Sequence, residues 1–380
     1  MASLTNCNCT LRRIAYLVIA SLIVGQVLMI YHVIVKKDAH KYKVHQINVS
    51  FHKNYSSDQD NDEFTDITSN FSSVVIDKLK SEATLNNVSF LAPMIASPTA
   101  CESMNYLLLV INSKVEHAGR RLAIRQSWGD AKNIDHFNEK AKTTKAAPPL
   151  KWKLIFIVGR SNTADINKKT EAEAKQYGDL IIGDFTDSMK SLTLKTVMAM
   201  QWAKHFCSPA IYYKGDDDVF VNPYLLYQIA EGYVRNNIKK EWICRAHIHP
   251  ISRRPVRNKR HRYYVPYSKY RQKLFPYFCS GFAYVMTGDA LSSMVSVVKT
   301  TPIIDSVDDA FVGILADKVK IKPKHDKRFK VYDRYDRRPN RFNRPNVEIE
   351  LMRKTLAEHG IYYLKMKTYM ANTNKAMLVK

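Results

Sequence analysis

The sequence predicts an α/β fold built around a mainly parallel β-sheet. Four short apolar runs between residues 106 and 213 are bounded by polar or turn-forming residues. Segments with the apolar spacing of helices lie between the later runs. Strands that alternate with helices form βαβ units, in which the strands run parallel.

The expected strands and helices follow one another closely. The strands are Tyr106–Ile111, Lys153–Val158, Leu180–Ile182 and Ala210–Tyr213. Short continuous apolar runs are consistent with buried strands. Helices are expected over Glu171–Tyr177 and over Ser191–His205, where apolar residues recur near the helical period.

A long apolar segment precedes this region. Residues Ile14–Val35 contain no Asp, Glu, Lys or Arg, and a membrane-spanning helix needs about 20 largely apolar residues. A cleaved signal peptide is the alternative, but its apolar core is usually about 7–15 residues long. The sequence therefore favours a transmembrane signal anchor over residues 14–35, with a cytosolic tail at 1–13.

The segment 36–98 is rich in Ser, Asn, Asp and Thr and is expected to form a flexible stem. It contains four N-glycosylation sequons, at Asn48, Asn54, Asn70 and Asn87. Their clustering indicates a segment that faces the secretory lumen. Residues 99–380 would then be one lumenal domain of a single-pass type II membrane protein.

The chain is strongly basic. Its 380 residues include 59 Lys and Arg against 35 Asp and Glu, a net charge of +24. Such an excess first suggests nucleic acid. Residues 99–380 carry almost all of it, with 50 basic and 27 acidic residues. Because that part is expected in the lumen, no nucleic-acid partner is expected.

The apolar content of 46% excludes a mainly disordered chain. Four cysteines, Cys101, Cys207, Cys244 and Cys279, fall in the expected lumenal domain. Disulfides persist in that compartment. Four cysteines allow three full pairings, and the sequence does not choose among them.

Three consecutive carboxylates, Asp216, Asp217 and Asp218, follow the last expected strand. Ligands of parallel α/β sheets bind beyond the carboxyl ends of the strands. Carboxylates there can offer oxygen ligands to Mg²⁺ or Mn²⁺. A solvated acidic turn is the alternative interpretation.

A second acidic pair, Asp308 and Asp309, precedes an apolar segment that can begin a helix. Its carboxylates either complement the helix dipole or supply a general base. Between the two acidic sites, Pro276 and Gly281 are expected to form a turn among aromatic residues, which either stack on a sugar or belong to the core. Residues 239–273 contain twelve Lys and Arg and one acidic residue, Glu241. They form either a solvated surface or a site that attracts phosphate or an acidic glycan.

Five ordered motifs resemble glycosyltransferase family 31, the β-1,3-galactosyltransferase-like enzymes. They are R-L-A-I-R-Q-S-W-G at 121–129, Y-G-D-L-I-I-G-D-F-T-D at 177–187, S-L-T-L-K-T at 191–196, D-D-D-V-F-V-N at 216–222 and F-P-Y-F-C-S-G at 275–281. The resemblance implies a GT-A fold that binds a UDP-sugar and Mn²⁺. It also implies inversion at the anomeric carbon, with a β-1,3 linkage formed.

The resemblance assigns roles to residues by position. Asp309 would be the catalytic base, and Asp216 and Asp218 the metal ligands. The donor side would contain Arg121, Arg125, Trp128 and Asp217, and the acceptor side Tyr277 and Gly281. Apart from the resemblance, His325 is a candidate to complete the metal shell, with a spacing that is not diagnostic. Where the family usually reads Glu-Asp-Val, this chain reads Asp308-Asp309-Ala310.

The expected activity is that of a Golgi-membrane hexosyltransferase. It would transfer galactose or N-acetylglucosamine to the 3-hydroxyl of a glycan on a glycoprotein or glycolipid. The altered Asp308-Asp309-Ala310 motif leaves one alternative, a membrane-anchored, lectin-like or chaperone-type pseudoglycosyltransferase.

Overall fold

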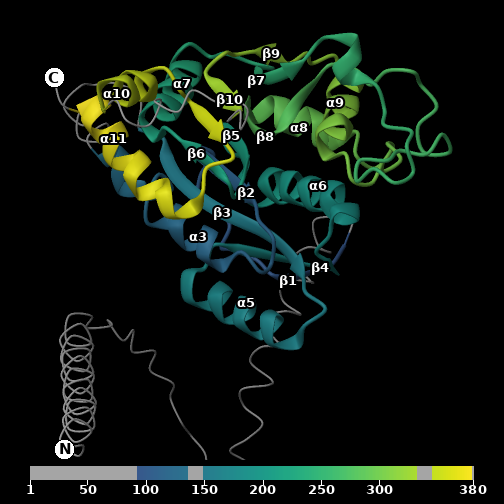
Figure 1. Ribbon diagram of the computed structural model, residues 1–380, viewed down its shortest axis with the longest axis horizontal. Helices are drawn as coiled ribbons and strands as arrows, with labels where there is room; N and C mark the ends of the chain where they lie inside the picture. The colour runs from purple at the N-terminus through teal and green to yellow at the C-terminus, as the bar shows by residue number, and fades with distance from the viewer. Residues whose placement is uncertain (1–91, 136–148, 332–344, 379–380) are drawn as a thin grey trace, which may run out of the picture. The chain divides into compact units, whose positions relative to one another are not determined.

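The protein is described from a computed structural model, which covers residues 92–135, 149–331 and 345–378 (Figure 1). The predicted tail, the anchor at 14–35, most of the stem and its four sequons lie outside these residues. Within them, no helix combines the length and the apolar character that crossing a membrane requires.

The described part centres on an eight-stranded sheet. In spatial order its strands are β1 (Met94–Ala96), β4 (Leu180–Thr186), β3 (Lys151–Arg160), β2 (Tyr106–Asn112), β5 (Ile211–Asp216), β8 (Phe278–Thr287), β7 (Trp242–His247) and β9 (Lys324–His325). The four expected strands are confirmed as β2, β3, β4 and β5, and they are mutually parallel. Because β1 and β8 run antiparallel to their neighbours, the whole sheet is mixed, and its other six strands share one direction.

A smaller sheet stands at the end of β5. It contains β10 (Phe329–Val331), β11 (Ala357–His359) and β6 (Val219–Val221) in that order. Since β6 starts three residues after Asp216, the acidic triplet is the connection between the two sheets. Antiparallel pairing of β11 with β6 sets His359 opposite Val219.

Helices cover both faces of the large sheet (Figure 1). They are α3 (Ala118–Arg125), α5 (Ala164–Tyr177), α6 (Leu192–Trp202), α7 (Pro223–Arg235), α8 (Gly288–Ser296), α9 (Asp308–Lys318), α10 (Pro345–Arg353) and α11 (Met366–Leu378). Short 3-10 turns occupy Ala131–Ile134, Met189–Ser191, Pro250–Arg253 and Tyr363–Lys365, and a π-helical turn occupies Ala203–Cys207. Both expected helices are confirmed, the first as the end of α5 and the second as α6 with the π-helical turn.

Two apolar cores lie on opposite faces of the sheet. Along β2, Leu107, Leu109 and Ile111 join the core on one face, with residues from α7, α10 and α11. Leu108 and Val110 join the other core, with residues from α6, α8 and α9. Successive side chains of a strand point to opposite faces, so a continuous apolar run fills both cores.

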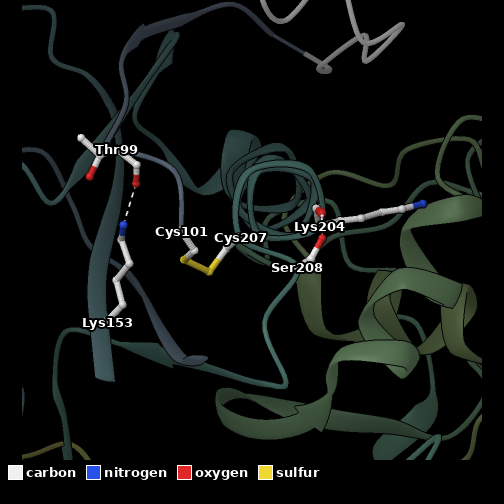
Figure 2. Close-up of a disulfide and its surroundings, with 6 residues drawn as sticks. All are labelled: Thr99, Cys101, Lys153, Lys204, Cys207 and Ser208. Atoms are coloured by element: carbon white, nitrogen blue, oxygen red, sulfur yellow. Dashed lines mark hydrogen bonds between the residues drawn. A yellow bond between two sulfur atoms is a disulfide. The ribbon is translucent and has the colours of Figure 1, made fainter. Parts of the chain in front are cut away.

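The four cysteines of residues 99–380 form two disulfides, Cys101–Cys207 and Cys244–Cys279. The second joins the adjacent strands β7 and β8. Cys101–Cys207 joins the segment before β2 to the π-helical turn after α6 (Figure 2). Beside it, the Lys153 side chain donates to the Thr99 carbonyl at 2.6 Å. The sequence allowed three pairings, and the fold brings together the segments that form these two disulfides.

We expect replacement of Cys101 and Cys207 by alanine to lower the free energy of unfolding by about 2–5 kcal/mol. The bridge closes a loop with a sequence separation of 106, so its loss frees much of the unfolded chain. Urea unfolding under non-oxidising, non-reducing conditions measures the change. Ser208→Ala is the local control, because it removes only a side-chain hydrogen bond to the Lys204 carbonyl. An unchanged midpoint in the double variant would contradict the prediction.

Candidate active site

The candidate site lies at the edge of the sheet where the parallel strands β2 and β5 end. Asn112, the last residue of β2, is in register with Asp216, the last residue of β5. Polar residues that follow the two strands therefore meet at one edge, as expected for ligand sites in parallel sheets.

A buried lysine joins the acidic groups that the sequence singled out. The Lys214 Nζ donates to Asp216 Oδ1 at 2.8 Å and to the Gly281 carbonyl, and lies 3.5 Å from Asp308 Oδ2. Burial acts to lower the pKa of Lys214, but the nearby carboxylates of Asp216 and Asp308 have the larger effect and raise this pKa. Burial raises the pKa of Asp216 to about 6 against the opposing charge of Lys214. One ammonium thus brings three distant segments together.

Asp308 and Asp309 begin α9, as the sequence indicated. Asp308 Oδ2 accepts from Thr196 Oγ1 at 2.7 Å, and Thr196 in turn accepts from Asn112 Nδ2 at 2.7 Å. Asp309 accepts from the Ala310 backbone N–H at 2.7 Å. Burial and the neighbouring Asp308 raise the pKa of Asp309 to about 7. Asp308 is therefore held by fixed partners, whereas Asp309 is the carboxylate poised to exchange a proton near neutral pH.

Asp217 is more buried than its two neighbours in the triplet. Its carboxylate accepts from Ser113 Oγ at 2.8 Å and from Arg120 at 2.9 Å, and lies 2.8 Å from His117 Nδ1. Although burial acts to raise it, these partners lower the pKa of Asp217. The Asp217 carboxylate therefore holds the loop that follows β2. It would act on a sugar donor only through the position of that loop.

Asp218 is more open and has a partner that the sequence analysis did not single out. His359 Nε2 lies 3.5 Å from Asp218 Oδ1, and the two side chains are 36% and 35% exposed. The Asp218 backbone carbonyl accepts from the N–H groups of Gly360 and Ile361. The pairing of β11 with β6 creates this contact. No local sequence signal marks a single histidine so far along the chain.

The residues present fit a divalent cation of the manganese type. Carboxylate oxygens and an imidazole are suitable ligands, and Asp218 and His359 present both at a partly exposed edge. Asp216 commits one oxygen to Lys214. In the described residues, no preassembled group of three or more His, Cys, Asp or Glu side chains is in place to hold a metal ion.

His325 lies elsewhere. It is on the edge strand β9, three strands away from β5. At about 4.8 Å between neighbouring strands, this is a separation of about 14 Å. Its Nδ1 accepts from the Ala246 backbone N–H at 3.3 Å. The structure therefore does not bring His325 to the acidic triplet, and His359 occupies the place expected for it.

Arg121 is fully buried and its guanidinium is occupied by protein partners. It donates to the Glu173 carboxylate at 2.9 and 2.6 Å. It also donates to Ser113 Oγ and to the carbonyls of Lys114 and Val115. Arg121 therefore shapes the loop after β2 from behind and has no donor group left for a ligand.

Arg125 and Trp128 are likewise structural. Arg125 binds Asp179 through two hydrogen bonds of 2.8 Å and stacks 4.0 Å from the ring centroid of Tyr177. Trp128 is fully buried and packs edge-on against Tyr213. The side chains of the motif assigned to the donor side therefore contact other residues of the protein. They hold α3 and the loop before it in place.

Of the two residues assigned to the acceptor side, Gly281 lies in β8 and Tyr277 immediately precedes this strand. Gly281 is within this strand, so the turn expected between Pro276 and Gly281 is wrong at its second residue. A Cβ at Gly281 would come within 3.3 Å of Asp309 Cβ, which explains how β8 passes so near the second acidic pair. Tyr277 is 39% exposed, and the Arg253 guanidinium lies 4.5 Å from its ring centroid.

An α/β domain with clustered carboxylates at the carboxyl ends of its parallel strands has the layout of proteins that bind nucleotide-type ligands there. The galactosyltransferase family profile matches residues 119–327, and the chain belongs to this family. The resemblance seen in the five motifs is thereby confirmed.

The curated relatives include two named transferases. Beta-1,3-galactosyltransferase 5 of Pan paniscus is 30% identical over 220 residues, which cover 57% of this chain and 66% of that protein. Lactosylceramide 1,3-N-acetyl-beta-D-glucosaminyltransferase of Mus musculus is 32% identical over 229 residues, which cover 59% of this chain and 57% of that protein. A solved galactosyltransferase LgtC, in complex with donor and acceptor sugar analogs, superposes with a TM-score of 0.33 at 12% identity, over 72% of this chain and 98% of that one.

Proposed function

We propose that the protein is a GT-A-type, inverting hexosyltransferase. It transfers galactose or N-acetylglucosamine from a UDP-sugar to the 3-hydroxyl of a glycan and forms a β-1,3 linkage. The observation that carries this proposal is the cluster of Lys214, Asp216, Asp308 and Asp309 at the carboxyl edge of the parallel strands. Family membership and the names of the relatives support the sugar and the linkage.

Asp309 is the group that takes the proton of the attacking hydroxyl. A pKa raised to about 7 keeps it basic enough to accept a proton yet largely ionised just above neutrality. Lys214 and Thr196 hold Asp308 beside it, so the pair keeps its geometry as Asp309 changes protonation. The acceptor hydroxyl attacks the anomeric carbon on the face opposite the leaving UDP, which inverts the configuration of that carbon. This single displacement needs only one base.

Asp218 and His359, with the remaining oxygen of Asp216, would hold a divalent cation such as Mn²⁺. When bound, such an ion neutralises negative charge on the UDP leaving group. Arg120 lies with its guanidinium between Asp217 and Asp218 and adds positive charge on the same side. Ser113 and the loop after β2 form the donor wall that Asp217 and Arg121 position.

For its location we propose a Golgi membrane, with the chain as a single-pass type II protein. The apolar segment at 14–35 and the cluster of four sequons behind it support this topology. The two lumenal disulfides are consistent with an oxidising compartment.

The proposed activity is tested by UDP release with a panel of UDP-galactose, UDP-N-acetylglucosamine and UDP-N-acetylgalactosamine, with Mn²⁺ and with chelator. We expect acceptor-dependent release from one of the first two donors and its loss with chelator. Release that never depends on a glycan acceptor would contradict the proposal. Glycan binding without any UDP release would favour the lectin-like alternative.

The cation site is tested by binding, independently of turnover. We expect Asp218→Asn and His359→Gln each to weaken Mn²⁺ binding about 10–100-fold, measured by calorimetry on the purified protein. His325→Gln is the matched control, because it removes the same kind of side chain from the far strand β9. Equal losses in the two histidine variants would contradict the assignment of His359.

A further inference from the structure

The long connection between β7 and β8, residues 248–277, is here named the basic lobe. Its two ends lie together, because His247 at the end of β7 pairs with Phe278 at the start of β8. The antiparallel pairing of β8 with β5 sets Gly215 opposite Ala283, so β8 begins beyond the carboxyl end of β5. The basic lobe therefore emerges at the edge that carries the acidic triplet. Figure 1 shows it in green as irregular chain that extends from the body of the domain.

The basic lobe contains nine Lys and Arg residues and no Asp or Glu. Two of them, Arg253 and Arg257, are partly buried. The other seven are exposed, and none of them forms an ion pair with another described residue: Arg254, Lys259, Arg260, Arg262, Lys269, Arg271 and Lys273. Seven like charges on one connection repel one another, so an anion that binds among them relieves that repulsion.

The two partly buried arginines give the lobe a fixed frame. Arg257 donates to the carbonyls of Val265 and Tyr270, both at 2.7 Å, and to that of Gln272. Arg253 donates to the Phe275 carbonyl at 2.8 Å. The exposed cations are therefore presented from an internally hydrogen-bonded connection rather than from a free chain.

Two tyrosines of the lobe carry stacked guanidinium groups. Tyr263 is partly buried, and its pKa is raised by burial and, against the opposing charge of Arg262, by the charges of Asp309, Asp308 and Asp216. The Arg262 guanidinium lies 4.6 Å from the Tyr263 ring centroid. Further along, Arg257 stacks 4.0 Å from the ring centroid of Tyr267.

We propose that the basic lobe is an acceptor subsite for an anionic glycan, one that carries a carboxylate or sulfate near the hydroxyl to be glycosylated. This proposal rests on the proposed transferase function and names its acceptor class. Guanidinium groups match the geometry of these anions. Because the lobe emerges at the edge that carries the acidic triplet, and Gly281 of β8 lies beside Asp309, an acceptor anion can bind the lobe while its hydroxyl reaches the base.

Two variants with the same change in charge test the proposal. The lobe variant combines Lys259→Gln, Arg260→Gln and Arg262→Gln. The control variant combines Lys168→Gln, Lys169→Gln and Lys175→Gln, which remove three exposed charges from α5. The acceptors are N-acetyllactosamine and its 6-sulfated form. We expect the lobe variant to lower the ratio of kcat/KM for the sulfated over the neutral acceptor about tenfold, and added salt to reduce the wild-type ratio. The control variant should leave the ratio unchanged.

A binding measurement separates this proposal from the transferase proposal. Binding of a labelled heparin tetrasaccharide is compared with that of neutral maltotetraose for the full chain and both variants. If the lobe variant alone loses tetrasaccharide binding while no donor is ever turned over, the lobe is a binding site for anionic glycans, and both its acceptor role and the proposed transferase function fail. If transfer proceeds but both variants change acceptor ratio and binding equally, or neither changes them, the subsite is wrong.

A membrane is the competing source of anions, since Ile251 and Tyr267 of the lobe are exposed by 68% and 65%. Vesicles of phosphatidylcholine with and without phosphatidylserine test it. Loss of phosphatidylserine-dependent binding in the lobe variant, with an unchanged acceptor ratio, would overturn the proposal. Equal vesicle binding by the wild type and the lobe variant, with a reduced acceptor ratio, supports it.

Discussion

Asp309→Asn is expected to lower kcat for glycan transfer by about 10³-fold while the protein stays folded. The asparagine keeps the shape of the side chain, and its amide oxygen can still accept from the Ala310 N–H. It cannot take a proton from the acceptor hydroxyl. Single-turnover measurement with saturating UDP-sugar isolates this step, and thermal unfolding confirms that the structure is retained.

Asp317→Asn is the matched control for this prediction. It removes the same charge from an exposed position on the same helix, α9, and should leave kcat unchanged. The pH profile supplies a second readout. Asp309 accepts a proton only when ionised, so the wild-type rate should fall as pH drops through about 7. An Asp309→Asn variant that keeps a tenth or more of wild-type kcat would refute the assignment.

Arg121→Met is expected to lower the free energy of unfolding by about 3–5 kcal/mol. The methionine preserves much of the apolar stem but leaves the carbonyls of Lys114 and Val115 without this donor. Glu173 then retains Arg125 as its ion-pair partner, at 2.8 Å. Because the loop after β2 loses its support, we also expect KM for the UDP-sugar to rise more than kcat falls.

Denaturant unfolding of Arg121→Met, Glu173→Gln and the double variant measures the coupling. The double variant should lower the free energy of unfolding by less than the sum of the two single variants, because each single variant leaves the other side chain buried without this partner. Arg160→Met is the control, because Arg160 is well exposed and 3.9 Å from Asp184. Additive effects would show that the pair is not coupled.

Burial acts to raise the pKa of Glu173, but Arg121 and Arg125 hold it below its ordinary value. Its stabilisation is therefore present above the unfolded-state pKa and falls as pH drops through the lowered value.

The elements that could be predicted were those whose evidence is local. An apolar run such as Tyr106–Ile111 fills cores on both faces of a sheet, and no other part of the chain is needed to recognise it. The start of α9 at Asp308 was recognisable for the same reason. Strand direction was predictable only where helices alternate with strands, so the antiparallel strands β1 and β8 were missed.

The motif at 121–129 was assigned to the donor side, but its arginines bind carboxylates of the protein. The pattern indicated the family, but its arginines are buried against Glu173 and Asp179 rather than directed to a ligand. A guanidinium can bind a phosphate or a carboxylate equally well. The spacing of residues in the sequence does not show which of these anions the guanidinium binds in the folded protein.

The sequence by itself determined the family, the acidic residues of the site and the strands that end beside them, because each depends on neighbours within a few residues. The tertiary structure alone decided which side chains meet. It set Lys214 between Asp216 and Asp308, placed His359 rather than His325 beside Asp218, paired Cys101 with Cys207, and brought the basic lobe to the carboxylate edge. These contacts join segments far apart in the chain, and their formation depends on strand order and register, which only the packed sheet defines.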